Sequence, residues 1–536
     1  MELIVSDAVI VTMAASTRST GPAEAMLIRD GRIAEVGPAE AVRAAAEPGA
    51  RVVSLDGATV IPGLIDAHCH VADVGYLATA ADCSQPSAPD IPAIQARLRE
   101  AAERTPEASW VTGGGYVEYK LREGRHPTRA DLDQAVPHRP AVLYHTSLHA
   151  CVLNSAALAE AGFSDGQPDP PGGAFGRDGE GRLDGVVFEG PMFALFERNL
   201  RDDLARMGSA GRARLVQMAA QRLAAFGLTT ACDADMRRDT FAAFADADAN
   251  GTLGLRVYGM IVHDQVDWIP RARHSDKLAT EAVKIWADGG MSSRTAAIHG
   301  SYPVPPYGSG ILYFERDELT EMVRRLDGLG FQVCIHAQGD RAIETVLDAY
   351  AAVLEGSTGN RRRHRIEHGG AMYPPLTARA AALGIVMVSQ PGFMSTLGDG
   401  FSAAFGDRAD QLYAFASWRR AGLTVAGSSD APVITADPLL GIRDAILRRT
   451  GEGRMLGPDE RLSALAALDL YTTQAAYAAH RETEVGSLEP GKLADFVVLD
   501  TNPLDADPEQ ITDITVLATV LGGTPVYQSA SVFPEG

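Results

Sequence analysis

The chain has 536 residues, a formal net charge of −21 and a hydrophobic fraction of 46%. This length exceeds one ordinary core but suits an elaborated α/β barrel with a small accessory domain. The acidic balance argues against nucleic acid as a partner, and the absence of an apolar run of ~18 residues argues against a membrane-spanning helix. The one basic run, "RRRHR" at 361–365, is interpreted as solvated surface ahead of a strand.

The two ends of the chain share a β-rich pattern. The N-terminal stretch "MELIVSDAVIVTM" carries acidic residues where a signal peptide carries positive charge, and it predicts a strand. Short strands with Gly or Asp turns continue to residue 61, and a similar pattern returns only in 485–536, which includes "GKLADFVVLD". We therefore expect 1–61 and 485–536 to form one small β domain. The five cysteines are scattered without a C-x-x-C pair, which favours a reducing cytoplasm.

Between these ends, residues 62–484 alternate short β-rich runs with helical stretches. Repeated βα units predict a parallel sheet, and seven runs together with "VIPGLIDAH" give eight strands. The expected fold class is therefore α/β, a (β/α)8 TIM-like barrel beside the small β domain. The seven runs cover 228–235, 255–262, 282–290, 331–339, 364–370, 384–391 and 423–430.

A long Gly/Pro-rich interval at about 73–215 interrupts the alternation after the first strand. It is far longer than a βα connection requires, so we interpret it as an insertion. An insertion that follows a barrel strand is expected to lie over the mouth of the barrel.

Polar residues suited to metal binding or proton transfer follow the predicted strands. Because active sites of barrel enzymes lie at the carboxyl ends of the strands, these residues are candidates for one site. Singly, each has a structural explanation: a hydrogen-bonded histidine, a rim lysine or a helix-capping aspartate. Six such residues at the same end of the predicted barrel favour one shared functional site. The residues are His68, His70, Lys284, His336, His368 and Asp430.

These motifs resemble the metal-dependent amidohydrolase superfamily, and more narrowly its YtcJ-like branch, which includes the N-substituted formamide deformylases. The resemblance covers almost the whole chain and rests on "PGLIDAHCH", "VKIWADGGMSSRTA", "IHAQGDRAI", "RIEHG", "SSDAPV" and "GSLEPGKLADFVVLD". It also supports the split β domain, because in this superfamily the two chain ends form a β-sandwich beside the barrel.

The resemblance implies a site of one or two divalent metal ions, with zinc as the best match to the ligands. His68 and His70 would bind one ion together with Asp430. His336 and His368 would bind a second, and Lys284 would bridge the two if its amine is carboxylated to N6-carboxylysine. Asp430 would move the proton, and His336 with the metal would stabilise the oxyanion.

The expected reaction is hydrolysis of a carbon–nitrogen bond in a small molecule such as an N-acyl or N-formyl amine. Two departures from the family bear on the substrate: "TSLH" stands where relatives show an Asp-Gly-His block, and "QPGF" stands where a histidine often follows "QP". Both favour an apolar or aromatic substrate. Residues expected to contact it are His149, Glu189, Asp288, Arg294 and Phe393.

Two alternatives stay open at the level of sequence. The same site could hydrolyse an ester, lactone, phosphotriester or cyclic amidine, or catalyse a decarboxylation, because fold does not fix function. A non-catalytic binding protein is the other alternative, which the intact ligand set disfavours. Relatives are often dimers or tetramers, so a homo-oligomer is compatible with the sequence.

Overall fold

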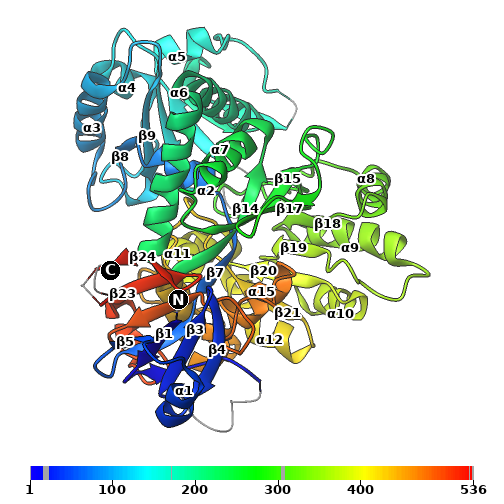
Figure 1. Ribbon diagram of the computed structural model, residues 1–536. Helices are drawn as coiled ribbons and strands as arrows, with labels where there is room; N and C mark the ends of the chain where they lie inside the picture. The colour runs from blue at the N-terminus through cyan, green and yellow to red at the C-terminus, as the bar shows by residue number, and fades with distance from the viewer. Residues whose placement is uncertain (1, 16–22, 171, 304–307, 530–531, 534–536) are drawn as a thin grey trace.

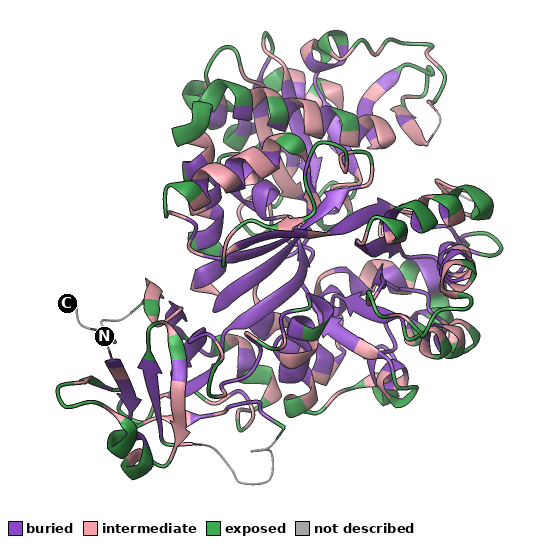
Figure 2. Ribbon diagram, turned by 45° about the vertical axis from the view of Figure 1, so that its right-hand side comes forward, coloured by how far each residue is buried: buried purple, intermediate pink, exposed green. Residues whose placement is uncertain are grey.

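A parallel barrel forms the centre of the computed structural model, which describes residues 2–15, 23–170, 172–303, 308–529 and 532–533. Its eight strands are hydrogen-bonded in the order β7, β14, β15, β17, β18, β19, β20 and β21. All are almost completely buried, as Figure 2 shows. Their bounds are β7 (Leu64–Cys69), β14 (Leu228–Met236), β15 (Arg256–Val262), β17 (Leu278–Trp286), β18 (Gln332–Ala337), β19 (Arg365–His368), β20 (Val386–Ser389) and β21 (Thr424–Gly427).

The barrel closes just beyond the ends of its first and last strands. The Asp430 amide donates to the His68 carbonyl at 2.8 Å, and the His70 amide donates to the Ala431 carbonyl at 2.7 Å. These bonds join β7 to the segment after β21, so the eight-stranded α/β barrel expected from the sequence is confirmed.

The sequence prediction for the first strand needs correction. The run "VIPGLIDAH" is not one strand: it is β6 (Thr59–Pro62) followed, after Gly63, by β7. The strand also ends at Cys69, and His70 begins helix α2 (Val71–Leu77). Although His70 lies just past the end of the strand, both His68 and His70 face Asp430. Cys69 packs in the core behind the strand.

A second unit brings the two ends of the chain together. In one of its two sheets, β2 and β6 from the N-terminal part pair through β6 with β22 from the C-terminal part, and β23 and β24 follow. Both sheets contribute to one apolar core. The boundaries 1–61 and 485–536 stay predictions. The strands are β1 (Glu2–Ser6), β2 (Val9–Ile10), β3 (Ala25–Arg29), β4 (Arg32–Gly37), β5 (Arg51–Ser54), β6, β22 (Phe496–Leu499), β23 (Val516–Leu521) and β24 (Thr524–Gln528).

The interval between β7 and β14 carries its own sheet, in the order β12, β13, β11, β10, β9, β8. It forms the upper part of Figure 1, together with helices α3, α4 and α5. Its elements are β8 (Ala81–Asp82), α3 (Ile91–Arg104), β9 (Val111–Tyr116), α4 (Arg129–Ala135), β10 (Ala141–His145), β11 (Ala150–Leu153), α5 (Ser155–Glu160), β12 (Gly173–Arg177), β13 (Leu183–Glu189) and α6 (Gly190–Ala225).

Helices follow the barrel strands in the expected alternation except after β15, which is connected to β17 through the short strand β16 (Ala272–Arg273). None of the helices in the described part of the chain is long and apolar enough to cross a membrane. The remaining helices are α1 (Ala39–Ala45), α7 (Arg238–Ala249), α8 (Arg316–Gly328), α9 (Asp340–Leu354), α10 (Pro374–Leu383), α11 (Phe393–Phe405), α12 (Phe415–Arg420), α13 (Pro438–Leu447), α14 (Ala464–Leu470) and α15 (Thr473–Ala478).

The basic run at 361–365 is only partly a solvated surface. Arg361 and Arg362 are exposed, but His364 and Arg365 are buried, and Arg365 begins β19 inside the barrel. The interpretation of the whole run as surface was therefore wrong at its end, because the strand begins within the run.

Candidate active site

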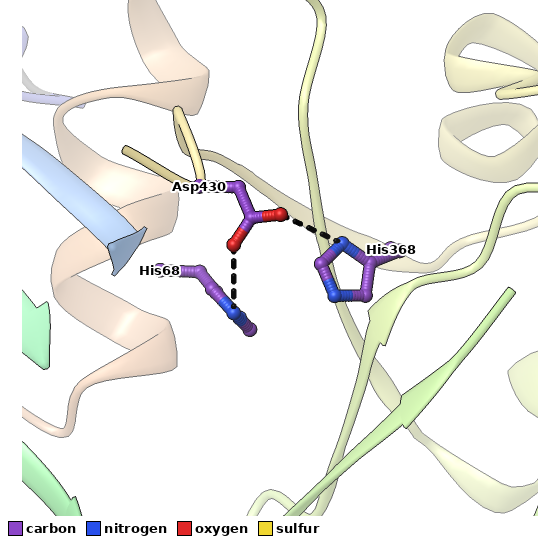
Figure 3. Close-up of side chains that lie close together, drawn as sticks. All are labelled: His68, His368 and Asp430. Carbon is purple, nitrogen blue, oxygen red and sulfur yellow. Dashed lines mark ion pairs between the residues drawn. The ribbon is translucent and has the colours of Figure 1, made fainter. Parts of the chain in front are cut away.

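Three buried side chains converge at the carboxyl end of the barrel: His68, His368 and Asp430. His68 Nε2 lies 3.4 Å from one Asp430 oxygen, and His368 Nδ1 lies 4.0 Å from the other (Figure 3). Each offers a ligand atom, and these atoms lie within 4.8 Å of one another. Imidazole nitrogen with carboxylate oxygen is a donor set that divalent metal ions prefer. The residues present therefore fit a divalent metal ion.

His70 and Lys284 border this group. His70 Nε2 lies 3.3 Å from the same Asp430 oxygen that faces His68. The Lys284 amine is fully buried and lies 3.0 Å from His68 Nε2. His68, His70, Lys284 and Asp430, which lie in or just after the first, fourth and eighth strands, are therefore neighbours at the carboxyl end of the barrel.

His336 completes the set from the fifth strand. Its ring centroid lies 4.5 Å from that of His368. Its Nε2 lies 3.2 Å from the Gly289 carbonyl and 3.3 Å from Asp288 Oδ1, so the opposite nitrogen, Nδ1, is left for a ligand. All six residues singled out from the strand ends therefore gather at one end of the barrel.

Sequence reasoning missed the carboxylate that orients His68. Glu367 lies inside the barrel on β19, and its carboxylate accepts from His68 Nδ1 at 2.5 Å. It also pairs with Arg365 through bonds of 2.7 and 2.8 Å. Because Nδ1 is held, His68 presents Nε2 to the site, an arrangement typical of metal-ligating histidines. The sequence did contain a sign of this role: Arg365 and Glu367 are a pair of charged residues within a buried strand.

The surroundings of Asp430 keep it ionised. Burial alone favours the protonated acid, but His368, His68 and His70 hold the pKa of this carboxyl well below its ordinary range. At neutral pH the Asp430 side chain is therefore an anionic carboxylate, the form that binds a metal ion.

A cavity of about 270 Å³ opens above these residues. Its lining includes five large apolar side chains: Phe193, Trp286, Phe314, Phe393 and Phe401. Phe393 therefore lies where the "QPGF" motif predicted, at the mouth of the seventh strand. The insertion contributes Ser147, Leu148 and His149, which agrees with its expected position over the barrel.

His149 and Glu189 form a fixed pair within the insertion. His149 Nδ1 lies 2.9 Å from Glu189, which is completely buried and also accepts from Tyr313 at 2.9 Å and from Thr295. Although burial disfavours the charged ring, the Glu189 carboxylate raises the pKa of His149. His149 lines the cavity, whereas Glu189 lies behind it and orients the ring.

Asp288 and Arg294 are not among the residues that line the cavity. Asp288 accepts from the backbone amides of Ala297, Gln338 and Gly339 at 2.8 to 2.9 Å, which fixes the loop beside His336. Arg294 lies on the same loop with φ 59°. A direct contact of either residue with substrate stays a prediction.

The cavity lining also includes a charged group that was not anticipated. Arg237 pairs with Asp235 at 2.9 Å and with Glu197 at 2.5 Å, and His263 lies nearby at the end of β15. Asp235 and His263 also lie at the carboxyl ends of barrel strands, so the reasoning that identified the other site residues could have found them. Glu197 lies on helix α6, and no motif in the sequence indicated that it would reach the cavity.

Comparison with known proteins agrees with this geometry. A family model described as "Amidohydrolase family" matches residues 51–527. The chain belongs to the amidohydrolase family. A second model, for a bacterial imidazolonepropionase-like composite domain, matches residues 25–46 of this amidohydrolase.

Curated relatives align along nearly the whole amidohydrolase chain. The N-substituted formamide deformylase of Arthrobacter pascens is 32% identical over 94% of this chain and 95% of its own length. YtcJ from Bacillus subtilis (strain 168), which carries the name of an amidohydrolase, is 30% identical over 95% of this chain and 96% of its own. The YtcJ-like branch is therefore confirmed.

Solved structures share the fold. A metal-dependent hydrolase from Pyrococcus horikoshii OT3 superimposes with a TM-score of 0.78 at 23% identity, covering 95% of this chain and 99% of the other. Family membership and the site together identify this amidohydrolase as a metal-dependent hydrolase that acts on carbon–nitrogen bonds.

Proposed function

We propose that this amidohydrolase hydrolyses the amide bond of an N-acyl or N-formyl amine that carries an apolar group. The observation that supports this most is the position of Asp430, which lies among three imidazoles in a cavity that is lined by several apolar side chains. The name of the Arthrobacter relative, an N-substituted formamide deformylase, points to the same bond.

The proposed metal is zinc, as one or two ions. His68, His70 and Asp430 would hold one ion, and His336 with His368 would hold the second. A divalent ion supplies Lewis acidity there, which makes water nucleophilic at neutral pH and polarises a carbonyl group.

The residues of the chain have separate roles in the proposed reaction. The Asp430 carboxylate accepts the proton of the attacking water and returns it to the leaving amine. His336, as a ligand of the second ion, would help to place the positive charge that stabilises the developing oxyanion. His149, oriented by Glu189, binds the amide group from the side of the insertion.

Lys284 is proposed to carry a carboxyl group on its amine. A protonated lysine cannot be a metal ligand, whereas a carbamate offers two anionic oxygens. Burial lowers the pKa of the Lys284 amine, which favours the neutral form that reacts with carbon dioxide. The amine lies 3.0 Å from His68 Nε2, within reach of an ion bound there.

Two variants test this function against a panel of N-formyl and N-acyl amines. We expect Asp430→Asn to lower kcat by about 100- to 10,000-fold, because the proton acceptor is removed. Lys284→Ala should lose both activity and part of the bound metal. Lys277→Ala is the matched control, since its amine only donates to the Leu253 carbonyl at 2.8 Å. Hydrolysis of esters but of no amide by the wild type would contradict the proposal.

A further inference from the structure

The hairpin loop between β10 and β11 contains a leucine in a left-handed conformation. Residues 146–149 join the two antiparallel strands above the cavity, and Leu148 has φ 52°. Hairpin loops of this length often need one left-handed residue, which glycine or asparagine normally supplies. A leucine there is strained, because its Cβ crowds the backbone.

The side chain of Leu148 cannot form a hydrogen bond that would offset the strain. Among the described residues, the non-glycine positions with positive φ are mostly polar or charged, and such side chains can hydrogen-bond locally; the aliphatic ones are Met13 and Leu148. Strained residues persist where the surrounding structure fixes them, and they gather at functional sites. The strained conformation of Leu148 beside the cavity therefore points to a functional role for this residue.

The loop is fixed from several sides. The Leu148 amide donates to the His145 carbonyl at 3.0 Å, and the His149 amide donates to Ser147 Oγ at 3.2 Å. The Thr146 hydroxyl donates to the Val433 carbonyl, in the segment that follows Asp430, at 2.9 Å. The loop is thus tied to the barrel, and Leu148 lines the cavity directly before His149.

The side chain of Leu148 is half-buried: it packs against the edge of the main apolar core and also lines the cavity. In the cavity it shares the apolar surface that Phe393 and Val433 provide. Glycine at this position would relax the backbone but would remove apolar surface beside the metal ligands.

We propose that Leu148 determines substrate specificity: it is held in a strained conformation in order to place an apolar side chain against the group next to the scissile bond. The amidohydrolase then selects amides whose substituent is aliphatic or aromatic over those with a polar substituent. This inference rests on the proposed function and deepens it.

The principal test is Leu148→Asn, because asparagine is close to leucine in size, tolerates the left-handed conformation and is polar. The readout is the ratio of kcat/KM for N-hexylformamide to that for N-(2-hydroxyethyl)formamide. We expect this ratio to fall about 10-fold or more, while the melting temperature stays equal or rises. An unchanged ratio would overturn the proposal.

Two further variants separate strain from contact. Leu148→Ala keeps a Cβ in the left-handed conformation and Leu148→Gly does not, so we expect the glycine variant to melt at the higher temperature. Both should lose the preference for the apolar substrate equally. The matched control is Leu383→Ala, a half-buried leucine outside the cavity, which should leave the ratio unchanged. Equal melting temperatures for the alanine and glycine variants would contradict the strain argument.

The same ligands distinguish failure of this inference from failure of the proposed function. If the wild type hydrolyses neither formamide, the proposed function is wrong, and the ratio of their dissociation constants, measured by calorimetry, replaces the kinetic ratio. A drop of that ratio in Leu148→Asn still supports the role of Leu148, and an equal ratio overturns it.

Discussion

Glu367 places a negative charge inside the barrel, where an apolar side chain would ordinarily pack. It is completely buried, and it pairs with Arg365 at 2.7 Å and with His68 Nδ1 at 2.5 Å. Removing one member of a buried pair leaves the other charge without compensation. The carboxylate therefore serves both the orientation of His68 and the stability of the barrel.

We predict that Glu367→Gln lowers the free energy of unfolding by about 3–5 kcal/mol in chelator-treated protein. Burial opposes ionisation, but Arg365 and His68 hold the pKa of Glu367 far below its ordinary value. The carboxylate's contribution to stability is therefore complete above the unfolded-state pKa of about 4.3 and is lost as the pH falls toward the lower folded-state pKa.

Denaturant unfolding between pH 7 and pH 3 measures this dependence. The difference between wild type and Glu367→Gln should shrink as the pH falls below about 4.3. Glu318→Gln, on the exposed face of α8, is the control and should show little difference at any pH. A difference for Glu367→Gln that grows on acidification would contradict the assignment.

At the level of elements, helix α6 links the insertion to the barrel. Its first half brings Met192, Phe193 and Phe196 to the cavity, and its second half packs on α7, with Arg212 bonded to Asp246 at 2.9 Å. The two halves meet at Gly208, whose φ of 65° and ψ of −180° are not helical. This backbone conformation is essentially restricted to glycine.

We predict that Gly208→Ala destabilises the protein by about 1–3 kcal/mol through backbone strain alone. An added Cβ meets no atom within 4 Å at this position, so no steric clash contributes. The control is Gly179→Ala, which also has open space around it but no positive φ. Equal unfolding free energies for the two variants would show that α6 does not require the break.

The strand-and-helix pattern and the six strand-end residues could be predicted because both follow from local rules. Repeated βα units imply a parallel barrel, and parallel strands bring their carboxyl ends to one edge. The exact end of β7 could not be derived this way: the strand ends at Cys69, and His70 is the N-cap residue of α2. The contact with Asp430 arises from the backbone bonds that close the barrel.

At the level of the whole molecule, the β-sandwich and the barrel are joined by buried polar contacts. Arg256 on β15 pairs with Asp495, just before β22, through bonds of 2.6 and 2.9 Å. The Thr519 hydroxyl on β23 donates to the Ala224 carbonyl near the end of α6 at 2.6 Å. The C-terminal strands thus support the elements that carry the site.

Side-chain pairs between residues that are far apart in the chain could not be predicted from the sequence. Arg256 and Asp495 are separated by 239 positions, and Glu197 meets Arg237 only after α6 crosses the barrel mouth. No local periodicity encodes either pairing. The left-handed Leu148 was likewise visible only as a departure from a family motif.

Elemental analysis of the purified wild-type protein, with Asp430→Asn and Lys284→Ala measured in parallel, is the most direct test of the central claim that the barrel holds a hydrolytic metal site. We predict roughly two equivalents of a divalent metal in the wild type and less in both variants. One equivalent that is unchanged in Lys284→Ala would remove the lysine from the site. No bound metal after expression in metal-replete medium would contradict the account.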